Sequence, residues 1–81
     1  MWFLYILKCK DGSLYTGIAK DPEKRFLEHK SGKGATYTRI HKPIKIVYIE
    51  KQKTRSLATK RECEIKKWPK TKKTALFSQN L

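Results

Sequence analysis

Acidic residues and cysteine are scarce in this chain, and each shortage limits the functions that it can have. The 81 residues contain 7 Asp and Glu against 20 Lys and Arg, which gives a formal net charge of +13 with neutral histidines. Such an excess goes beyond what solubility requires, so it predicts a polyanionic partner. Nucleic acid is favoured over an anionic membrane or a ribosome-like surface.

The two cysteines, Cys9 and Cys63, exclude a disulfide framework and show no zinc-ligand spacing. They fit reduced thiols that act as small hydrophobes. Long hydrophobic runs are also missing: residues 1–9 are apolar but too short to span a bilayer, and they lack the basic start of a signal peptide. We therefore expect a cytoplasmic protein without a membrane role. Because repeats, linkers and low-complexity tracts are absent, we expect one domain over residues 1–81.

The hydrophobic pattern predicts a small α/β fold with the element order ββαβαα. Residues 2–9 are apolar on both alternations, which is typical of a strand covered on both faces, so this strand is placed centrally. A crossover through the first helix would place the third strand beside it. The other predicted elements are strands at 13–19 and 44–50, helices at about 22–30, 55–68 and 71–78, and a basic loop at 35–43. The predicted apolar arc of the second helix consists of Leu57, Ala58, Ile65 and Trp68.

The turn Lys10-Asp11-Gly12 decides which side chains of the first two strands share a face. A two-residue Asp-Gly turn would put Tyr5 and Tyr15 on opposite faces. A three-residue loop with Gly12 in the left-handed region would put both tyrosines on one face and Gly17 across from Tyr5. We favour this second register, because an open notch beside Tyr5 would explain a glycine inside a strand.

The first helix carries candidate catalytic residues behind a clear start signal. Asp21 is a good N-cap, and Pro22 suits the first helical position. Arg25 and His29 then lie one turn apart on one face. An arginine fork matches phosphate oxygens two at a time, and histidine can move a proton near neutral pH.

From the residues alone, less specific interpretations stay open. The tyrosines fit packing aromatics, and Arg25 and His29 fit a solvated helix surface. A lone glutamate suits Mg²⁺, yet the second helix offers both Glu62 and Glu64 without a choice between them. Glu62 also fits a simple ion pair with Lys66, four residues later.

Four blocks follow one another in the sequence. They are Phe3-Leu4-Tyr5, Tyr15-Thr16-Gly17 with its continuation to His29, Gly34-Ala35-Thr36-Tyr37-Thr38-Arg39, and Ala58-Thr59-Lys60-Arg61-Glu62-Cys63-Glu64-Ile65-Lys66. Together and in this order they resemble the GIY-YIG nuclease domain, in particular its short stand-alone bacterial members. Phe3-Leu4 replaces the Gly-Ile of the first motif, and the tyrosine is kept. The resemblance covers about residues 3–68, most of the chain.

The resemblance implies a three-stranded antiparallel sheet flanked by helices, and a metal-dependent endonuclease that hydrolyses DNA. Nicked, branched or single-stranded DNA, as met in DNA repair, is the expected substrate class. In this reading Tyr15 acts on the attacking water with help from Tyr5 and His29, and Arg25 holds the scissile phosphate. Glu62, rather than Glu64, binds a single divalent ion, Mg²⁺ or Mn²⁺. The predicted nucleic-acid contacts are Gly17, Lys33, Tyr37, Arg39 and Lys42.

A second function stays open, because no separate targeting domain is recognised in the sequence. The alternative is a basic nucleic-acid-binding module with weak or partner-dependent cleavage. In both cases we expect a monomer, which a protein partner could direct to its target.

Overall fold

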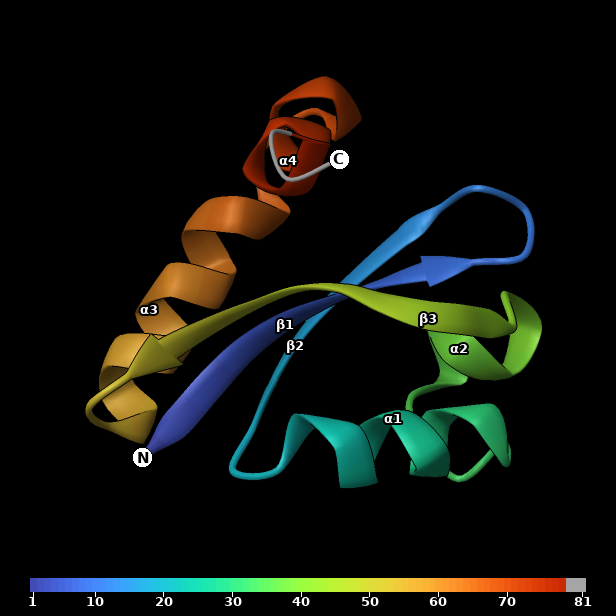
Figure 1. The fold of residues 1–81 in the computed structure, drawn as a ribbon, viewed down its shortest axis with the longest axis horizontal. Helices are drawn as coiled ribbons and strands as arrows, with labels where there is room; N and C mark the ends of the chain where they lie inside the picture. Colours follow the sequence, from blue (N-terminus) through green and yellow to red (C-terminus); the bar gives the residue numbers. More distant parts are fainter. Residues whose placement is uncertain (79–81) are drawn as a thin grey trace.

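One antiparallel sheet with the strand order β2-β1-β3 forms the centre of the computed structural model, which describes residues 1–78 (Figure 1). The predicted three-stranded sheet with a central first strand and flanking helices is confirmed. Residues 79–81 of the predicted domain lie outside the described range. The elements are β1 (Trp2–Cys9), β2 (Leu14–Ala19), α1 (Pro22–Lys30), α2 (Thr36–Ile40), β3 (Pro43–Gln52), α3 (Arg55–Lys66) and α4 (Lys70–Ser78).

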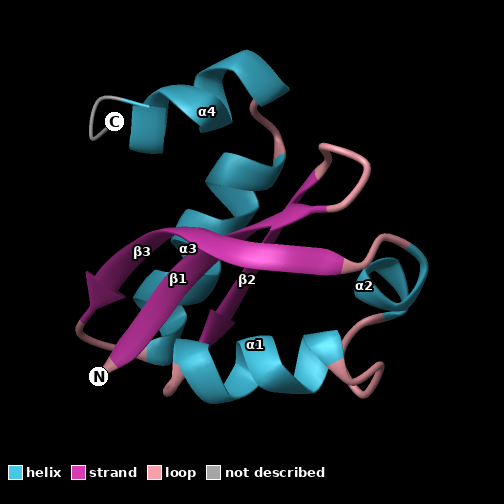
Figure 2. Cartoon of the chain, turned by 45° about the vertical axis from the view of Figure 1, so that its right-hand side comes forward, coloured by secondary structure: helices cyan, strands magenta, loops and turns pink. Residues whose placement is uncertain are grey.

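Helices cover both faces of the sheet, so β1 is buried on both sides (Figure 2). On one face Leu4 and Ile6 pack against Ile65 of α3, with partly buried side chains of α4 around them. On the other face Tyr5 belongs to a second cluster that includes Phe26 of α1. The alternation of β1 therefore sends Leu4 and Ile6 toward α3, and it sends Tyr5 and Leu7 toward α1.

The hairpin between β1 and β2 has the predicted three-residue loop. Gly12 has a φ of 86°, in the left-handed region that glycine adopts at little cost. The Cys9 amide bonds to the Ser13 carbonyl at 2.9 Å, which closes the loop. Tyr5 pairs with Gly17, and Leu7 pairs with Tyr15, so the predicted register is confirmed.

The structure adds one helix to the predicted elements, shifts several element ends by one or two residues, and exposes one predicted core residue; β3, for example, runs over Pro43–Gln52 rather than 44–50. The loop predicted over residues 35–43 contains α2, whose single turn is too short to leave a periodic hydrophobic pattern. α3 ends at Lys66 rather than at Trp68, because the residue before a proline disfavours the helical region, and Pro69 follows Trp68. Leu57 is 46% exposed and lies outside the core, whereas Ala58 and Ile65 are fully buried as predicted.

The helices within residues 1–78 are too short and too polar to cross a membrane.

α3, the longest of the helices within residues 1–78, has 12 residues and is joined to β3 by an ion pair. Arg61 Nε of α3 lies 2.9 Å from Glu50 Oε2 of β3. This ion pair fixes the helix that carries Glu62 against the sheet.

Candidate active site

Tyr5 and His29 form a buried hydrogen-bonded pair between the sheet and α1. Each residue is only 1% exposed, and the Tyr5 hydroxyl lies 2.9 Å from His29 Nε2. The start of α1 determines where His29 falls: Asp21 Oδ1 accepts the Lys24 amide at 3.2 Å, and Pro22 occupies the first turn as predicted. Burial distinguishes His29 from a solvated surface histidine, the less specific interpretation of the sequence.

Further aromatic rings extend this pair into a cluster. The Tyr15 ring lies 6.5 Å from that of Tyr5 and 5.1 Å from that of His29, between centroids. Tyr37 of α2 stacks on Tyr15 at 5.7 Å, and His41 stacks on Tyr37 at 4.4 Å. We call these five residues the aromatic cluster. Tyr5 and Tyr15 thus share one face of the sheet, as the favoured register predicts.

Gly17 lies directly beneath the Tyr5 hydroxyl. A Cβ atom at this position would lie 2.6 Å from Tyr5 Oη and 3.2 Å from a carbon of the Tyr15 ring. The sequence predicts an open notch here, and that detail is wrong, because the hydroxyl of Tyr5 fills the space. Glycine at position 17 therefore permits Tyr5 to reach His29.

Tyr5 holds its proton firmly in the free protein. Burial raises the pKa of Tyr5 to about 12, and the charge of an ionised Tyr15 adds to the increase. The nearby Arg25 guanidinium acts in the opposite direction on the pKa of Tyr5. Burial, followed by the charge of Arg25, lowers the pKa of His29. At neutral pH a protonated Tyr5 therefore faces a neutral His29, which retains one nitrogen lone pair as a proton acceptor.

Arg25 combines exposure to solvent with proximity to the cluster. Its side chain is 37% exposed, and its Nη1 forms an ion pair with Glu28 Oε1 at 3.1 Å. Glu28 was not identified from the sequence; its i,i+3 spacing from Arg25 is the signal that could have revealed it. A phosphate that binds Arg25 must therefore compete with this carboxylate.

The structure distinguishes the two glutamates of α3. Glu62 lies close enough to Tyr5 for its negative charge to raise the pKa of the hydroxyl, and its side chain is only 18% exposed. It forms an ion pair with Lys66 at 3.3 Å. Glu64 is 55% exposed and pairs with Arg61 at 3.7 Å. Of the two carboxylates, Glu62 is therefore the one whose charge acts on Tyr5.

The metal ligands available near Glu62 suit a cation that needs few ligands from the protein. Within residues 1–78, no three His, Cys, Asp or Glu side chains gather in a way that could hold a metal ion. A site based on Glu62 would therefore offer one carboxylate. Mg²⁺ fits such a site, because it usually keeps several waters and binds one or two carboxylates together with substrate phosphates. Mn²⁺ accepts the same oxygen ligands.

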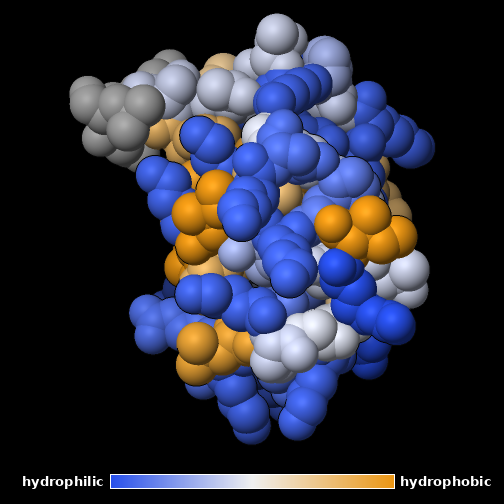
Figure 3. Space-filling model, turned by 90° about the vertical axis from the view of Figure 1, so that its right-hand side faces the viewer, coloured by the Kyte–Doolittle hydropathy of each residue, from blue (hydrophilic) through white to orange (hydrophobic). Residues whose placement is uncertain are grey.

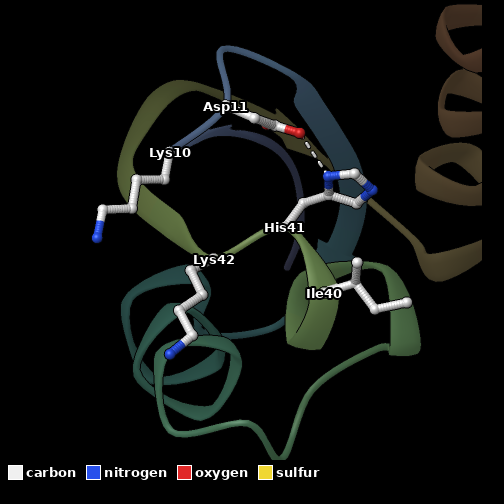
Figure 4. Close-up of a pocket in the computed structure, with 5 residues that line it drawn as sticks. All are labelled: Lys10, Asp11, Ile40, His41 and Lys42. Atoms are coloured by element: carbon white, nitrogen blue, oxygen red, sulfur yellow. Dashed lines mark hydrogen bonds and ion pairs between the residues drawn. The ribbon is translucent and has the colours of Figure 1, made fainter.

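The remaining predicted nucleic-acid contacts lie on the surface beyond the cluster. Lys33 and Arg39 are both exposed to solvent. Lys42 lines a shallow pocket of about 200 Å³ at the tip of the hairpin, together with Lys10 and His41. Figure 4 shows the amino groups of both lysines pointing away from Asp11, and Figure 3 shows a mainly hydrophilic face with separate apolar patches.

Asp11 links the hairpin tip to the aromatic cluster. His41 Nδ1 donates to its carboxylate (Figure 4). The Ser13 amide also donates to this carboxylate, at 3.0 Å. Hydrogen bonds from Ser13 and then from His41 lower the pKa of Asp11. The sequence identified Asp11 only as a turn residue, since a contact across 30 residues leaves no local pattern.

Two small residues near His29 were also missed. Thr38 is 1% exposed, and its hydroxyl lies 2.7 Å from His29 Nδ1. A Cβ atom on Gly34 would overlap the His29 ring, with Cγ at 2.7 Å. Both residues lie in the block that includes Tyr37. The sequence predicts a basic loop over this block, and a threonine in such a loop gives no sign that its side chain is buried.

Comparison with known proteins found a matching family model and several similar bacterial proteins. The family model described as the GIY-YIG catalytic domain matches residues 1–75. The UPF0213 protein SSP2268 of Staphylococcus saprophyticus is 54% identical over 77 residues, which cover 95% of this chain and 94% of that protein. The UPF0213 protein SERP0126 of Staphylococcus epidermidis is 49% identical with the same coverage.

Two solution NMR structures are also similar. The UPF0213 protein BH0048 of Bacillus halodurans has a TM-score of 0.60 and 41% identity, and the match covers 98% of this chain and 85% of that one. EF2693 of E. faecalis has a TM-score of 0.59 and 44% identity, over 88% of this chain and 76% of that one.

Proposed function

This chain belongs to the GIY-YIG catalytic domain family, and on that premise we propose that it is a metal-dependent endonuclease acting on DNA. The observation that carries the proposal is the hydrogen-bonded Tyr5–His29 pair, with Arg25 next to Tyr5 and Glu62 close enough for its charge to act on the same hydroxyl. These residues come from β1, α1 and α3, and together they offer a proton acceptor, a phosphate-binding cation and a carboxylate for an ion.

In the proposed reaction, Arg25 binds the scissile phosphate through its guanidinium fork, leaving its ion pair with Glu28. The Tyr5 oxygen accepts a proton from the attacking water while the Tyr5 proton passes to His29 Nε2. Tyr5 therefore need not ionise before the reaction, which suits its raised pKa. A divalent ion bound by Glu62 would neutralise charge on the phosphate and stabilise the leaving oxygen.

The division of work between the tyrosines differs from the one that the family resemblance alone implies. That resemblance puts Tyr15 on the attacking water. Tyr5 has the direct hydrogen bond to His29, whereas Tyr15 contacts the pair through its ring. We therefore assign the proton relay to Tyr5. Tyr15 has a supporting role, because its ring packs against the rings of Tyr5 and His29.

One observation favours the alternative, a nucleic-acid-binding module with weak or partner-dependent cleavage. In the free protein Arg25 is paired with Glu28, and Glu62 is paired with Lys66. Substrate or a partner must break both ion pairs before the phosphate and the ion can bind. Such a site binds the surrounding DNA more readily than it cleaves it.

A cleavage assay separates these two functions. Purified protein is incubated with duplex, nicked, branched and single-stranded DNA, in the presence of Mg²⁺, Mn²⁺ or EDTA. We expect cleavage of at least one structure with either ion and none with EDTA. Binding to every substrate without cleavage would favour the alternative, and cleavage in EDTA would contradict the proposed metal dependence.

A further inference from the structure

Thr38 has a buried hydroxyl group, to which the proposed reaction gives no direct role. It lies on α2, 1% exposed, and Oγ1 makes two hydrogen bonds. One joins it to the Ala35 carbonyl at 2.9 Å, and the other to His29 Nδ1 at 2.7 Å. Since a carbonyl oxygen can only accept, the single hydroxyl proton of Thr38 points at Ala35.

This direction fixes the protons of the whole chain of hydrogen bonds. The Thr38 oxygen presents a lone pair to His29, so Nδ1 must carry the proton that it receives. A neutral histidine has only one ring proton, so Nε2 is left as an acceptor. The Tyr5 hydroxyl at 2.9 Å must then be the donor to Nε2.

We propose that Thr38 is a positioning residue, which holds His29 in the Nδ1-protonated tautomer so that Nε2 can take the Tyr5 proton. The inference rests on the proposed function for its catalytic consequence. In the opposite tautomer Nε2–H would donate to Tyr5, and His29 could not receive a proton at that atom. The hydroxyl therefore sets the direction in which the proton moves.

Gly34 supports the same arrangement by confining the ring. A Cβ atom there would overlap Nδ1, which shows how closely the backbone passes the imidazole. A half-turn of the ring would replace both bonding nitrogens with carbons and break both hydrogen bonds. The close backbone and the two hydrogen bonds select one orientation and one tautomer.

The direct test is the tautomer of His29 in solution. Protein labelled with ¹⁵N-histidine is studied by long-range ¹H–¹⁵N NMR at a pH where His29 is neutral. We expect Nδ1 to show the protonated type of shift and Nε2 the unprotonated type. Wild-type protein with mainly Nε2–H would overturn the proposal without any variant.

Two substitutions separate the hydroxyl from the shape of the side chain. Thr38→Val keeps the shape and removes the hydroxyl, so the Nδ1-protonated form should lose its dominance. Thr38→Ser keeps the hydroxyl, so it should retain the wild-type spectrum. A Thr38→Val spectrum identical to that of the wild type would contradict the assigned role.

The kinetic consequence distinguishes positioning from simple support of the fold. Thr38→Val should lower kcat at least about tenfold with KM unchanged, whereas Thr38→Ser should recover most of kcat. A rise in KM with unchanged kcat would overturn the proposal. If wild-type protein cleaves no DNA, the proposed function fails, and the tautomer spectra still decide whether Thr38 orients His29.

Discussion

At the scale of single residues, the charged groups of the site neutralise one another in the free protein. Arg25 pairs with Glu28, Glu62 pairs with Lys66, and the buried Tyr5 keeps its proton. The two ion pairs are partly exposed to solvent, and pairs of this kind contribute little to stability. A phosphate or an ion can therefore replace one partner of each pair at a small cost in free energy. The site can therefore be stable without substrate and still reorganise around it.

The metal ligand is tested by replacing one carboxylate at a time. Glu62→Gln keeps the shape and removes the charge that Mg²⁺ requires, so cleavage should fall about 100-fold or more. DNA binding measured without metal should be unchanged or slightly tighter, because a negative charge has been removed. Glu64→Gln is the matched control on the exposed side of α3 and should retain activity. Equal losses in the two variants would show that Glu62 has no special role.

The two tyrosines are compared by removing each hydroxyl. Tyr5→Phe breaks the hydrogen bond to His29, so it should lower kcat about 100-fold or more, within the range of general acid–base catalysis. Tyr15→Phe keeps the ring contacts and should cost less. If Tyr15→Phe lost as much activity as Tyr5→Phe, the proton relay would have to be reassigned to Tyr15.

Burial of His29 predicts a loss of stability in weak acid. Above about pH 6.5 both the folded and the unfolded chain hold a neutral His29, and full stability is present. Below that pH the unfolded chain takes up a proton that the buried ring resists, because its folded pKa is lowered. The free energy of unfolding should therefore fall as the pH drops from about 6.5 toward the folded pKa.

The measurement is best made in a His41→Gln background, in which His29 is the remaining histidine. Urea unfolding at a series of pH values gives the dependence of the unfolding free energy on pH, and NMR titration of the His29 ring gives its pKa in the folded protein. A ring that titrates at or above its ordinary value would rule out this account of its burial.

At the scale of elements, the hairpin uses two glycines for different purposes. Gly12 supplies a left-handed turn residue, and Gly17 leaves room for the Tyr5 hydroxyl. Gly12→Ala should cost about 1 kcal/mol in unfolding free energy and leave activity nearly unchanged. Gly17→Ala should lower kcat at least tenfold, out of proportion to its effect on stability, because Tyr5 must shift away from His29. Full activity in Gly17→Ala would show that this close contact is not required.

The elements that sequence predicts well here are those with strong local signals. Gly12 and Gly17 indicated the hairpin register, and the Asp21-Pro22 pair indicated the start of α1. The burial of His29 could not be predicted in this way, because it depends on α2 folding back over α1. α2 is held over α1 by the hydrogen bond between Thr38 and His29 and by the close approach of Gly34 to the same ring. The five residues of α2 are too few to show a helical period in the sequence.

The site shows a similar division between local and distant information. The sequence identified Tyr5, Arg25 and His29 as candidates, and the structure brings these three residues together. The partners of these residues were missed. Glu28 is a neighbour on the same helix, whereas the link from Asp11 to His41 joins positions 30 residues apart. Such contacts follow from the completed fold and not from any one segment.

At the scale of the whole molecule, a net charge of +13 should make DNA binding strongly dependent on salt. Each phosphate contact releases counterions, so the logarithm of the association constant should fall linearly with the logarithm of salt concentration. Fluorescence anisotropy with labelled DNA over a salt series measures this slope. A slope near zero would exclude phosphate contacts as the main source of affinity.

The same measurement locates the binding surface. If the surface includes the predicted segment from Lys33 to Lys42, then Lys42→Gln should reduce the slope by about one and weaken binding to all sequences alike. Lys67→Gln removes the same charge from the exposed end of α3 and should change the slope less. Both variants have the same net charge, so a difference between them reports a local contact and not the overall field. Equal effects would mean that the DNA is held by the charge of the whole molecule, without a preferred face around the aromatic cluster.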